Sequence, residues 1–165
     1  MPSKYVVRNF TENSSYHIFN RGVDNRDIFL DEKDYRFFET YLFIYLKPIK
    51  QVLEKYPDVP SRLHSKNLSK EVDLLGYCLM PSHFHLLLKQ KTKNGISKLM
   101  KQIINAYTLF FNQKNKRSGS LIQGRFKAMQ IHEDSLHNLE LEFKKFHSDA
   151  ERSTEEQEKL KNLTI

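Results

Sequence analysis

Residues 72–89 read VDLLGYCLMPSHFHLLLK, and this stretch decides the fold of the chain. It holds two apolar runs on either side of the short break Met80-Pro81-Ser82. Apolar runs of this length around a turn signal predict two strands joined as an antiparallel hairpin. Because side chains alternate between the two faces of a strand, His83 and His85 are expected on one face and Phe84 on the other. The sequence therefore predicts a sheet with one apolar face and one face that carries two histidines.

The segments around this hairpin alternate between strand and helix patterns. Asp31 is a helix-capping residue, and Pro48 ends the apolar helical pattern that follows it. We expect, in chain order, a strand at 16–20, a helix at 31–47, strands at 72–79 and 83–89, a helix at 96–113, a strand at 121–131 and a helix through 136–146. This order predicts an α+β fold, a ferredoxin-like βαββαβ antiparallel sheet with helices on one face and an additional C-terminal helix.

Residues 48–71 contain three prolines and many polar side chains, so we expect a loop with one short helical piece there. The chain has 165 residues, of which 39% are hydrophobic, and this suits one folded domain. We divide it into a domain at 1–148 and a charged C-terminal helical extension or tail at 149–165. The apolar runs are far shorter than the roughly 20 residues that span a bilayer. With no signal-peptide pattern and the single Cys78, a reducing, cytoplasmic location is expected.

Charge is distributed unevenly along the chain. Residues 133–165 hold nine acidic and five basic side chains, so the net charge of +7 arises from the residues before them. The 59 residues from Leu74 to His132 contain ten lysines and arginines and not one Asp or Glu. A folded segment of this kind attracts polyanions, although a basic surface with no partner would have the same composition. We expect nucleic acid to be the partner.

His83-Phe84-His85 is the sharpest chemical feature of the sequence. Two imidazoles on one face of a strand can chelate a divalent metal, or they can be hydrogen-bonded structural residues. The longer His-x-His-x-Asp-His pattern of metallo-hydrolases does not follow, because three leucines come next. Two ligands alone leave a metal in need of further ligands from elsewhere.

Several short blocks in this chain carry a family resemblance when they are taken together and in order. They are 16–22 (YHIFNRG), 28–29 (IF), 80–87 (MPSHFHLL), 107–112 (YTLFFN) and 119–127 (GSLIQGRFK). From residue 16 to residue 128 the sequence resembles the REP-associated tyrosine transposases, which belong to the HUH single-tyrosine transposase superfamily.

The resemblance implies a fold, a metal and a substrate. In this family the two histidines hold Mg²⁺ or Mn²⁺, and a tyrosine attacks a phosphodiester of single-stranded DNA, which leaves a 5′-phosphotyrosine and a free 3′-hydroxyl. The substrate is a DNA hairpin beside a single strand. Related transposases often pair, so a homodimer is consistent with the resemblance, although nothing in the sequence requires one. A DNA partner and a nucleoid-associated place in the cytoplasm are consistent with the same resemblance, and the short apolar runs already argue against a membrane partner.

The nucleophile is where the sequence departs from the family. In this family it lies in the helix after the Gly-Arg-Phe-Lys block, and in this chain that position falls on Phe143, which has no oxygen to attack phosphorus. His147, four residues on, falls where the third metal ligand would be; alternatively, Phe143 packs in the core and His147 lies on the surface. Tyr107 is a candidate for a relocated nucleophile, although its place on an apolar helix stripe favours burial.

Basic side chains are the candidates for phosphate contacts. The residues that we expect to bind DNA are Arg21, Lys98, Lys101, Lys114, Lys116, Arg117, Arg125 and Lys127. Three functions stay open on the sequence alone: an active strand-transfer enzyme, a cleavage-deficient relative that binds DNA hairpins, and an RNA-binding module on the same sheet.

Overall fold

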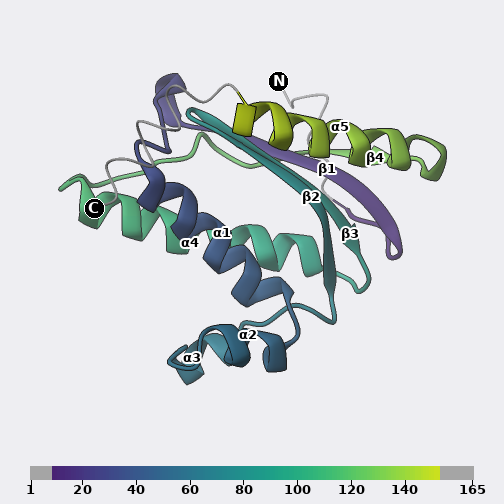
Figure 1. Cartoon of the computed structure of the whole chain (residues 1–165), viewed down its shortest axis with the longest axis horizontal. Helices are drawn as coiled ribbons and strands as arrows, with labels where there is room; N and C mark the ends of the chain where they lie inside the picture. Colours follow the sequence, from purple (N-terminus) through teal and green to yellow (C-terminus); the bar gives the residue numbers. More distant parts are fainter. Residues whose placement is uncertain (1–8, 153–165) are drawn as a thin grey trace.

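The computed structural model describes residues 9–152, with side chains described as far as Phe143, and it has the predicted βαββαβα order (Figure 1). The main elements are β1 (Ser14–Arg21), α1 (Glu32–Leu46), β2 (Val72–Met80), β3 (His83–Gln90), α4 (Gly95–Lys114), β4 (Lys127–Ile131) and α5 (Glu133–Arg152). Shorter pieces are the 3-10 helix η1 (Val23–Asn25), α2 (Ile49–Lys55) and α3 (Ser61–His64). Among the residues described, none of the helices combines the length and the apolarity needed to cross a membrane.

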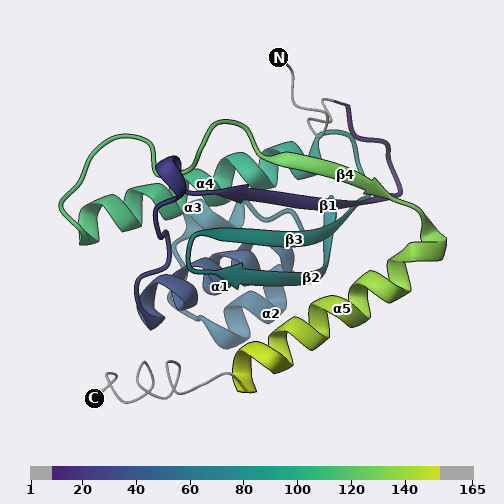
Figure 2. The ribbon, with the colours of Figure 1, turned by 90° about the horizontal axis from the view of Figure 1, so that it is seen from above.

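The four strands form one antiparallel sheet in the order β2-β3-β1-β4. β2 and β3 form the predicted hairpin, in which Met80 pairs with His83. β1 lies between β3 and β4, so the first and last strands of the chain are neighbours (Figure 2). This is the strand order of a ferredoxin-like fold, and the predicted fold class is confirmed.

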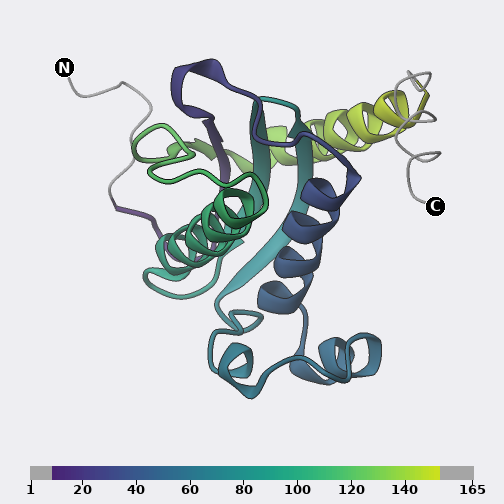
Figure 3. The ribbon, with the colours of Figure 1, turned by 90° about the vertical axis from the view of Figure 1, so that its left-hand side faces the viewer.

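Helices α1 and α4 cover one face of the sheet, as Figure 3 shows. Helix α1 begins as predicted, because the Asp31 side chain accepts a hydrogen bond from the Asp34 backbone N–H while Asp34 caps in return. It ends at Leu46, before Pro48. Phe38 of α1, Phe84 of β3 and Tyr107 of α4 are buried side by side in the core between these layers.

Helix α5 packs on the opposite face of the sheet (Figure 3). Phe143 is its buried anchor and lies against Cys78 and Leu87. Gly76 of β2 lies against the ring, and a Cβ atom at this position would stand 3.4 Å from Phe143 Cβ. The C-terminal helix therefore closes part of the histidine face and leaves the rest open. Of the predicted extension at 149–165, residues 149–152 belong to α5 and the remainder lies outside the described residues, so the division into domain and tail stays a prediction.

Two predicted segments differ in detail from the structure. The fourth strand, expected at 121–131, is regular only from Lys127 to Ile131. Gly124 has a φ of +55°, which a regular strand does not adopt, so residues 121–126 form a loop beside the end of β1, with a single bridge between Gly22 and Ile122. The segment 48–71 contains two short helices rather than one, separated by a turn that holds two prolines.

Candidate nucleic-acid and metal site

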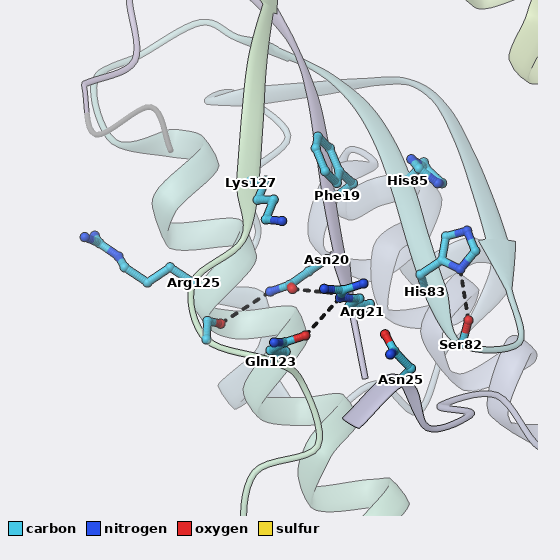
Figure 4. Close-up of a pocket in the computed structure, with 11 residues that line it drawn as sticks. Phe19, Asn20, Arg21, Asn25, Ser82, His83, His85, Gln123, Arg125 and Lys127 are labelled. Atoms are coloured by element: carbon cyan, nitrogen blue, oxygen red, sulfur yellow. Dashed lines mark hydrogen bonds between the residues drawn. The ribbon is translucent and has the colours of Figure 1, made fainter. Parts of the chain in front are cut away.

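A cleft of about 520 Å³ opens where the ends of β1 and β3 meet the loop before β4. Figure 4 shows His83 and His85 on one side of this cleft and Lys127 on the other, with Arg21 between them. We call it the histidine cleft. Its remaining lining residues are Phe19, Asn20, Asn25, Ser82, Gln123, Gly124 and Arg125. Not one of the lining residues is a carboxylate.

Strand pairing places both histidines at the cleft. On β1, Arg21 lies opposite His83, and Phe19 lies opposite His85. The two imidazole rings have centroids 5.1 Å apart, while Phe84 between them is fully buried on the other face. The structure thus brings the two predicted metal ligands together on one side of β3, as the period of a strand requires.

Each of the two imidazoles has a hydrogen-bond partner at Nδ1. Ser82 Oγ lies 3.1 Å from His83 Nδ1, and His17 Nε2 lies 2.9 Å from His85 Nδ1. Metal-binding histidines commonly have a second-layer partner on the nitrogen that does not bind the metal, and this partner fixes the ring and its tautomer. The same arrangement here leaves Nε2 of both rings available to a ligand.

His17 is the site residue that sequence reasoning missed. It stands in β1, two residues before Phe19, and its ring stacks on that of His85 at 5.1 Å between centroids. The sequence shows that His17 belongs to a strand. It does not show which residue of another strand lies beside it, and that depends on the register of β1 against β3.

Burial favours the neutral form of two of the imidazoles in this region, those of His85 and His17. Burial, together with smaller contributions from the neighbouring His17 and His83, lowers the pKa of His85 to about 4. Burial also lowers the pKa of His17. A neutral ring has a lone pair to offer, so the donor set fits a divalent ion that accepts nitrogen ligands, and it suits Mn²⁺ better than Mg²⁺, which prefers oxygen.

The number of protein ligands is small. Within residues 9–143, no group of three or more His, Cys, Asp or Glu side chains is arranged to hold a metal ion. His147 falls in the last turns of α5, and its side chain lies outside the described residues. A metal at His83 and His85 would need further ligands from outside the side chains of residues 9–143, such as water, phosphate oxygens of a bound nucleic acid or His147.

The structure sorts the predicted DNA-binding cations into two groups. Lys114 is paired with Asp31 and, at 2.8 Å, with the fully buried Asp34. Burial disfavours the charge of Lys114, but hydrogen bonds to these two carboxylates outweigh it and raise its pKa. Lys98 is paired with Glu71 at 2.8 Å. These two lysines hold parts of the fold together, and the structure does not bring them to the cleft.

The second group has no carboxylate partner within the part of the chain that the structure describes. Arg21 donates to the neutral Gln123, at 2.9 Å, and Lys127 lines the cleft beside it. Arg125 is exposed and extends away from the histidines (Figure 4). Lys101 and Lys116 are exposed on α4 and on the turn after it, and Arg117 bonds to neutral groups of its own turn, Asn112 and the Ser120 carbonyl.

The two candidate nucleophile positions lie on opposite faces of the sheet. Phe143 is on the histidine side, and its ring meets that of His17 edge-on at 5.7 Å between centroids. Tyr107 is fully buried on the other side, where its hydroxyl donates to the Ile28 carbonyl and burial raises its pKa. The structure therefore does not bring Tyr107 to the histidines. The ring is buried in the core, as its place on the apolar stripe of the helix suggested.

The described residues thus form a ferredoxin-like sheet with a His-x-His pair and unpaired cations at one cleft. Residues 12–140 match the family described as IS200-like transposases, and the chain belongs to this family. The predicted resemblance to transposases is confirmed, and DNA is the class of ligand that the family membership gives.

Two solved structures are similar to the chain. One is described as a candidate transposase from Deinococcus radiodurans, with 12% identity, coverage of 88% of this chain and 97% of that chain, and a TM-score of 0.46. The other is a REP-associated tyrosine transposase bound to a REP hairpin, with 13% identity, coverage of 81% of this chain and 66% of that chain, and a TM-score of 0.44. No curated protein matches the chain.

Proposed function

We propose that this transposase-family protein binds single-stranded or hairpin DNA in the histidine cleft, with Mn²⁺ or Mg²⁺ held by His83 and His85. One observation carries the proposal: unpaired cations and the imidazoles of His83 and His85 share a cleft that no carboxylate lines. The DNA backbone carries a negative charge at every nucleotide. Cations in the cleft can neutralise these phosphates, since no carboxylate of the cleft competes with the phosphates for the cations. Arg21 and Lys127 are the residues that we assign to phosphate contacts there.

The metal, when bound, supplies positive charge beside the phosphoryl oxygens of one phosphodiester. His83 and His85 provide two nitrogen ligands, and their Nδ1 partners Ser82 and His17 hold the rings in position. We assign His17 the role of a positioning residue for His85. The protein thus contributes two imidazoles that are already held in position, together with the cations Arg21 and Lys127, which orient the DNA strand.

Cleavage requires a nucleophile at this cleft, and no tyrosine from Tyr16 to Tyr107 is among the lining residues. At the position where the family carries its tyrosine, this chain has Phe143, packed 5.7 Å from His17. Phe143 favours a DNA-binding relative that does not cleave its substrate through a tyrosine at this position. The second candidate function is an active strand-transfer enzyme. It would need a nucleophilic tyrosine other than those between Tyr16 and Tyr107, because none of these lines the cleft.

The decisive experiment incubates the full chain with a library of labelled single-stranded DNA hairpins and Mn²⁺, followed by a denaturing gel. The proposal predicts retention of DNA in a native gel and no covalent adduct. It further predicts an adduct for Phe143→Tyr, which would restore the phenol. Phe143→Leu is the matched control for packing, and Phe143→Tyr combined with His83→Ala and His85→Ala is the control for the metal site.

Three outcomes would overturn parts of this proposal. An adduct formed by the unchanged protein would establish the active enzyme. Equal affinity for matched RNA and DNA hairpins, without metal dependence, would favour the RNA-binding alternative. Failure to bind any hairpin at low salt would remove nucleic-acid binding altogether.

The assembly state and the cellular place stay predictions of the family resemblance. A homodimer is the assembly that the resemblance suggests, and light scattering with and without hairpin DNA would test it. Association with the nucleoid follows if the chain binds DNA in the cell, and imaging of a tagged protein would test it.

A further inference from the structure

A second hollow, of about 280 Å³, lies between α4 and the loop that leads into β4. Lys101, Ile104 and Asn105 line it from α4, and Phe10 and Phe126 line it from the other side. We call this hollow the α4 groove. It shares Asn20, Gly124 and Arg125 with the histidine cleft, so the two hollows meet along one rim.

The charge of the α4 groove matches that of the histidine cleft. No carboxylate lines it, and its two cations, Lys101 and Arg125, are exposed and have no ion-pair partner among residues 9–143. Lys98, which precedes Lys101 by about one turn of the same helix, is paired with Glu71 and does not line the groove. Free positive charge is therefore concentrated where the hollow is, rather than spread evenly along α4.

The walls of the groove suit a flat, apolar group. Phe10 and Phe126 are half-buried, with near-parallel rings whose centroids are 6.0 Å apart. Met100 and Ile104 add further apolar surface, and Asn105 offers an exposed amide. Aromatic rings beside unpaired cations are the combination that single-strand binding proteins use, since each nucleotide brings one stacking base and one phosphate.

The rim between the two hollows is formed at Gly124 by backbone that no distant side chain covers. Gly124 adopts a φ of +55°, and no atom stands within 4 Å of the position that a Cβ would take. The Asn20 side chain donates to the Gly124 carbonyl at 3.3 Å and holds this backbone in place. Arg125 then projects from the rim on the side away from the histidines (Figure 4).

We propose that the α4 groove binds unpaired nucleotides of the same DNA strand that occupies the histidine cleft, the strand crossing the rim at Gly124. This inference rests on the proposed function, and it adds a second subsite for the bases that flank the metal site. Lys101 contacts a phosphate in the groove, Arg125 contacts the phosphate at the rim, and a base packs against Phe126.

The test measures the affinity of the full chain for oligo-dT strands of increasing length, from about 4 to about 16 nucleotides, by fluorescence anisotropy. We expect affinity to rise by roughly tenfold once the strand is long enough to fill both hollows. Lys101→Gln and Asn105→Asp, which change exposed side chains of the groove, should remove this increment. Lys50→Gln, which removes an exposed cation of α2 outside the groove, should retain it.

A second test changes the DNA instead of the protein, so its result does not depend on whether a protein variant folds. Replacing the added nucleotides by abasic ones keeps the phosphates and removes the bases, so the increment should shrink if bases stack in the groove. An increment that survives both Lys101→Gln and Asn105→Asp would overturn the subsite, while binding of the shortest strands would still support the cleft. If no strand of any length binds, the proposed function itself fails.

Discussion

The two faces of the sheet carry different kinds of side chain on the same strands. On the face under α1 and α4, Phe84, Leu86 and Leu88 of β3 are fully buried. On the other face, His83 and His85 of the same strand line an open cleft. Alternation along one strand thus separates the residues that hold the fold from those that carry its chemistry.

The faces also differ in how their side chains are held. The covered face is almost entirely apolar, whereas polar side chains on the open face hold one another, as in the pairs His17 with His85 and Arg21 with Gln123. Hydrogen bonds between side chains therefore hold the residues of the cleft in position. Substitutions on the two faces should therefore affect different properties.

The sharpest test of this comparison uses three successive residues of β3. Phe84→Ala should lower the free energy of unfolding by about 3–5 kcal/mol, because it opens a cavity between Phe38 and the sheet. His83→Ala and His85→Ala should change it by about 1 kcal/mol or less, while removing Mn²⁺ binding. Urea denaturation and calorimetry with Mn²⁺ measure the two effects. Equal destabilisation by all three would break the comparison.

A second test concerns the ion pair at the start of α1. Lys114→Met should lower the free energy of unfolding by roughly 3 kcal/mol, because it leaves the fully buried Asp34 carboxylate without its cation. Lys116→Met, an exposed neighbour, is the control and should have little effect. If Lys114 instead binds DNA, its substitution would reduce DNA affinity and spare stability.

The ion pair between Lys114 and Asp31 also predicts how stability depends on pH. Burial raises the pKa of Asp31, but its hydrogen bonds with Lys114 and the backbone outweigh this and lower it. A carboxyl whose pKa is lower in the folded state contributes stability above its unfolded value of about 3.9, and the contribution is lost as the pH falls through the folded value. Acid unfolding should therefore depend less on pH in this range for Lys114→Met, and a similar acid slope would contradict the assignment.

On the open face, His17 should act on metal affinity. His17→Leu removes the partner of His85 Nδ1 and should weaken Mn²⁺ binding by about 10- to 100-fold. His17→Gln, which retains an acceptor, should recover part of this loss. Calorimetry gives the affinity, and the nitrogen chemical shifts of His85 report its tautomer. Unchanged affinity and tautomer in His17→Leu would show that the contact is packing alone.

The smallest effect is expected for Tyr107→Phe on the covered face. It removes the hydrogen bond to the Ile28 carbonyl and should cost about 1–2 kcal/mol of stability. DNA and metal binding should be unchanged, since the hydroxyl lies on the far side of the sheet from the histidines. If the unchanged protein does form a covalent DNA adduct, loss of that adduct in Tyr107→Phe would assign Tyr107 to catalysis.

Local patterns in the sequence were enough to predict most of the fold. Asp31 and Pro48 set the bounds of α1, and alternation in β3 placed His83 and His85 on one face. The short β4 was not predicted, because the apolar pattern of 121–131 conceals the backbone conformation at Gly124.

The site was harder to predict because it depends on contacts between distant segments. Counting lysines could not separate Lys114, which is paired with carboxylates at the start of α1, from Lys101, which has no such partner in the described chain. His17 reaches His85 only through the register of two strands. Charge and motif indicated the class of ligand, and the tertiary structure selected the residues that can meet it.

The most direct measurement compares two double variants with equal loss of charge. Arg21→Gln with Lys127→Gln removes free cations of the histidine cleft, and Lys91→Gln with Lys98→Gln removes cations that are paired with Asp73 and Glu71. Affinity for a single-stranded DNA hairpin is measured over a range of salt concentrations. We expect the affinity of the cleft variant to fall at least about tenfold. The slope of log affinity against log salt concentration should become shallower by roughly 0.7 for each lost phosphate contact, and the paired-cation variant should change little in both quantities. Equal losses in both variants, or none in the cleft variant, would contradict the account.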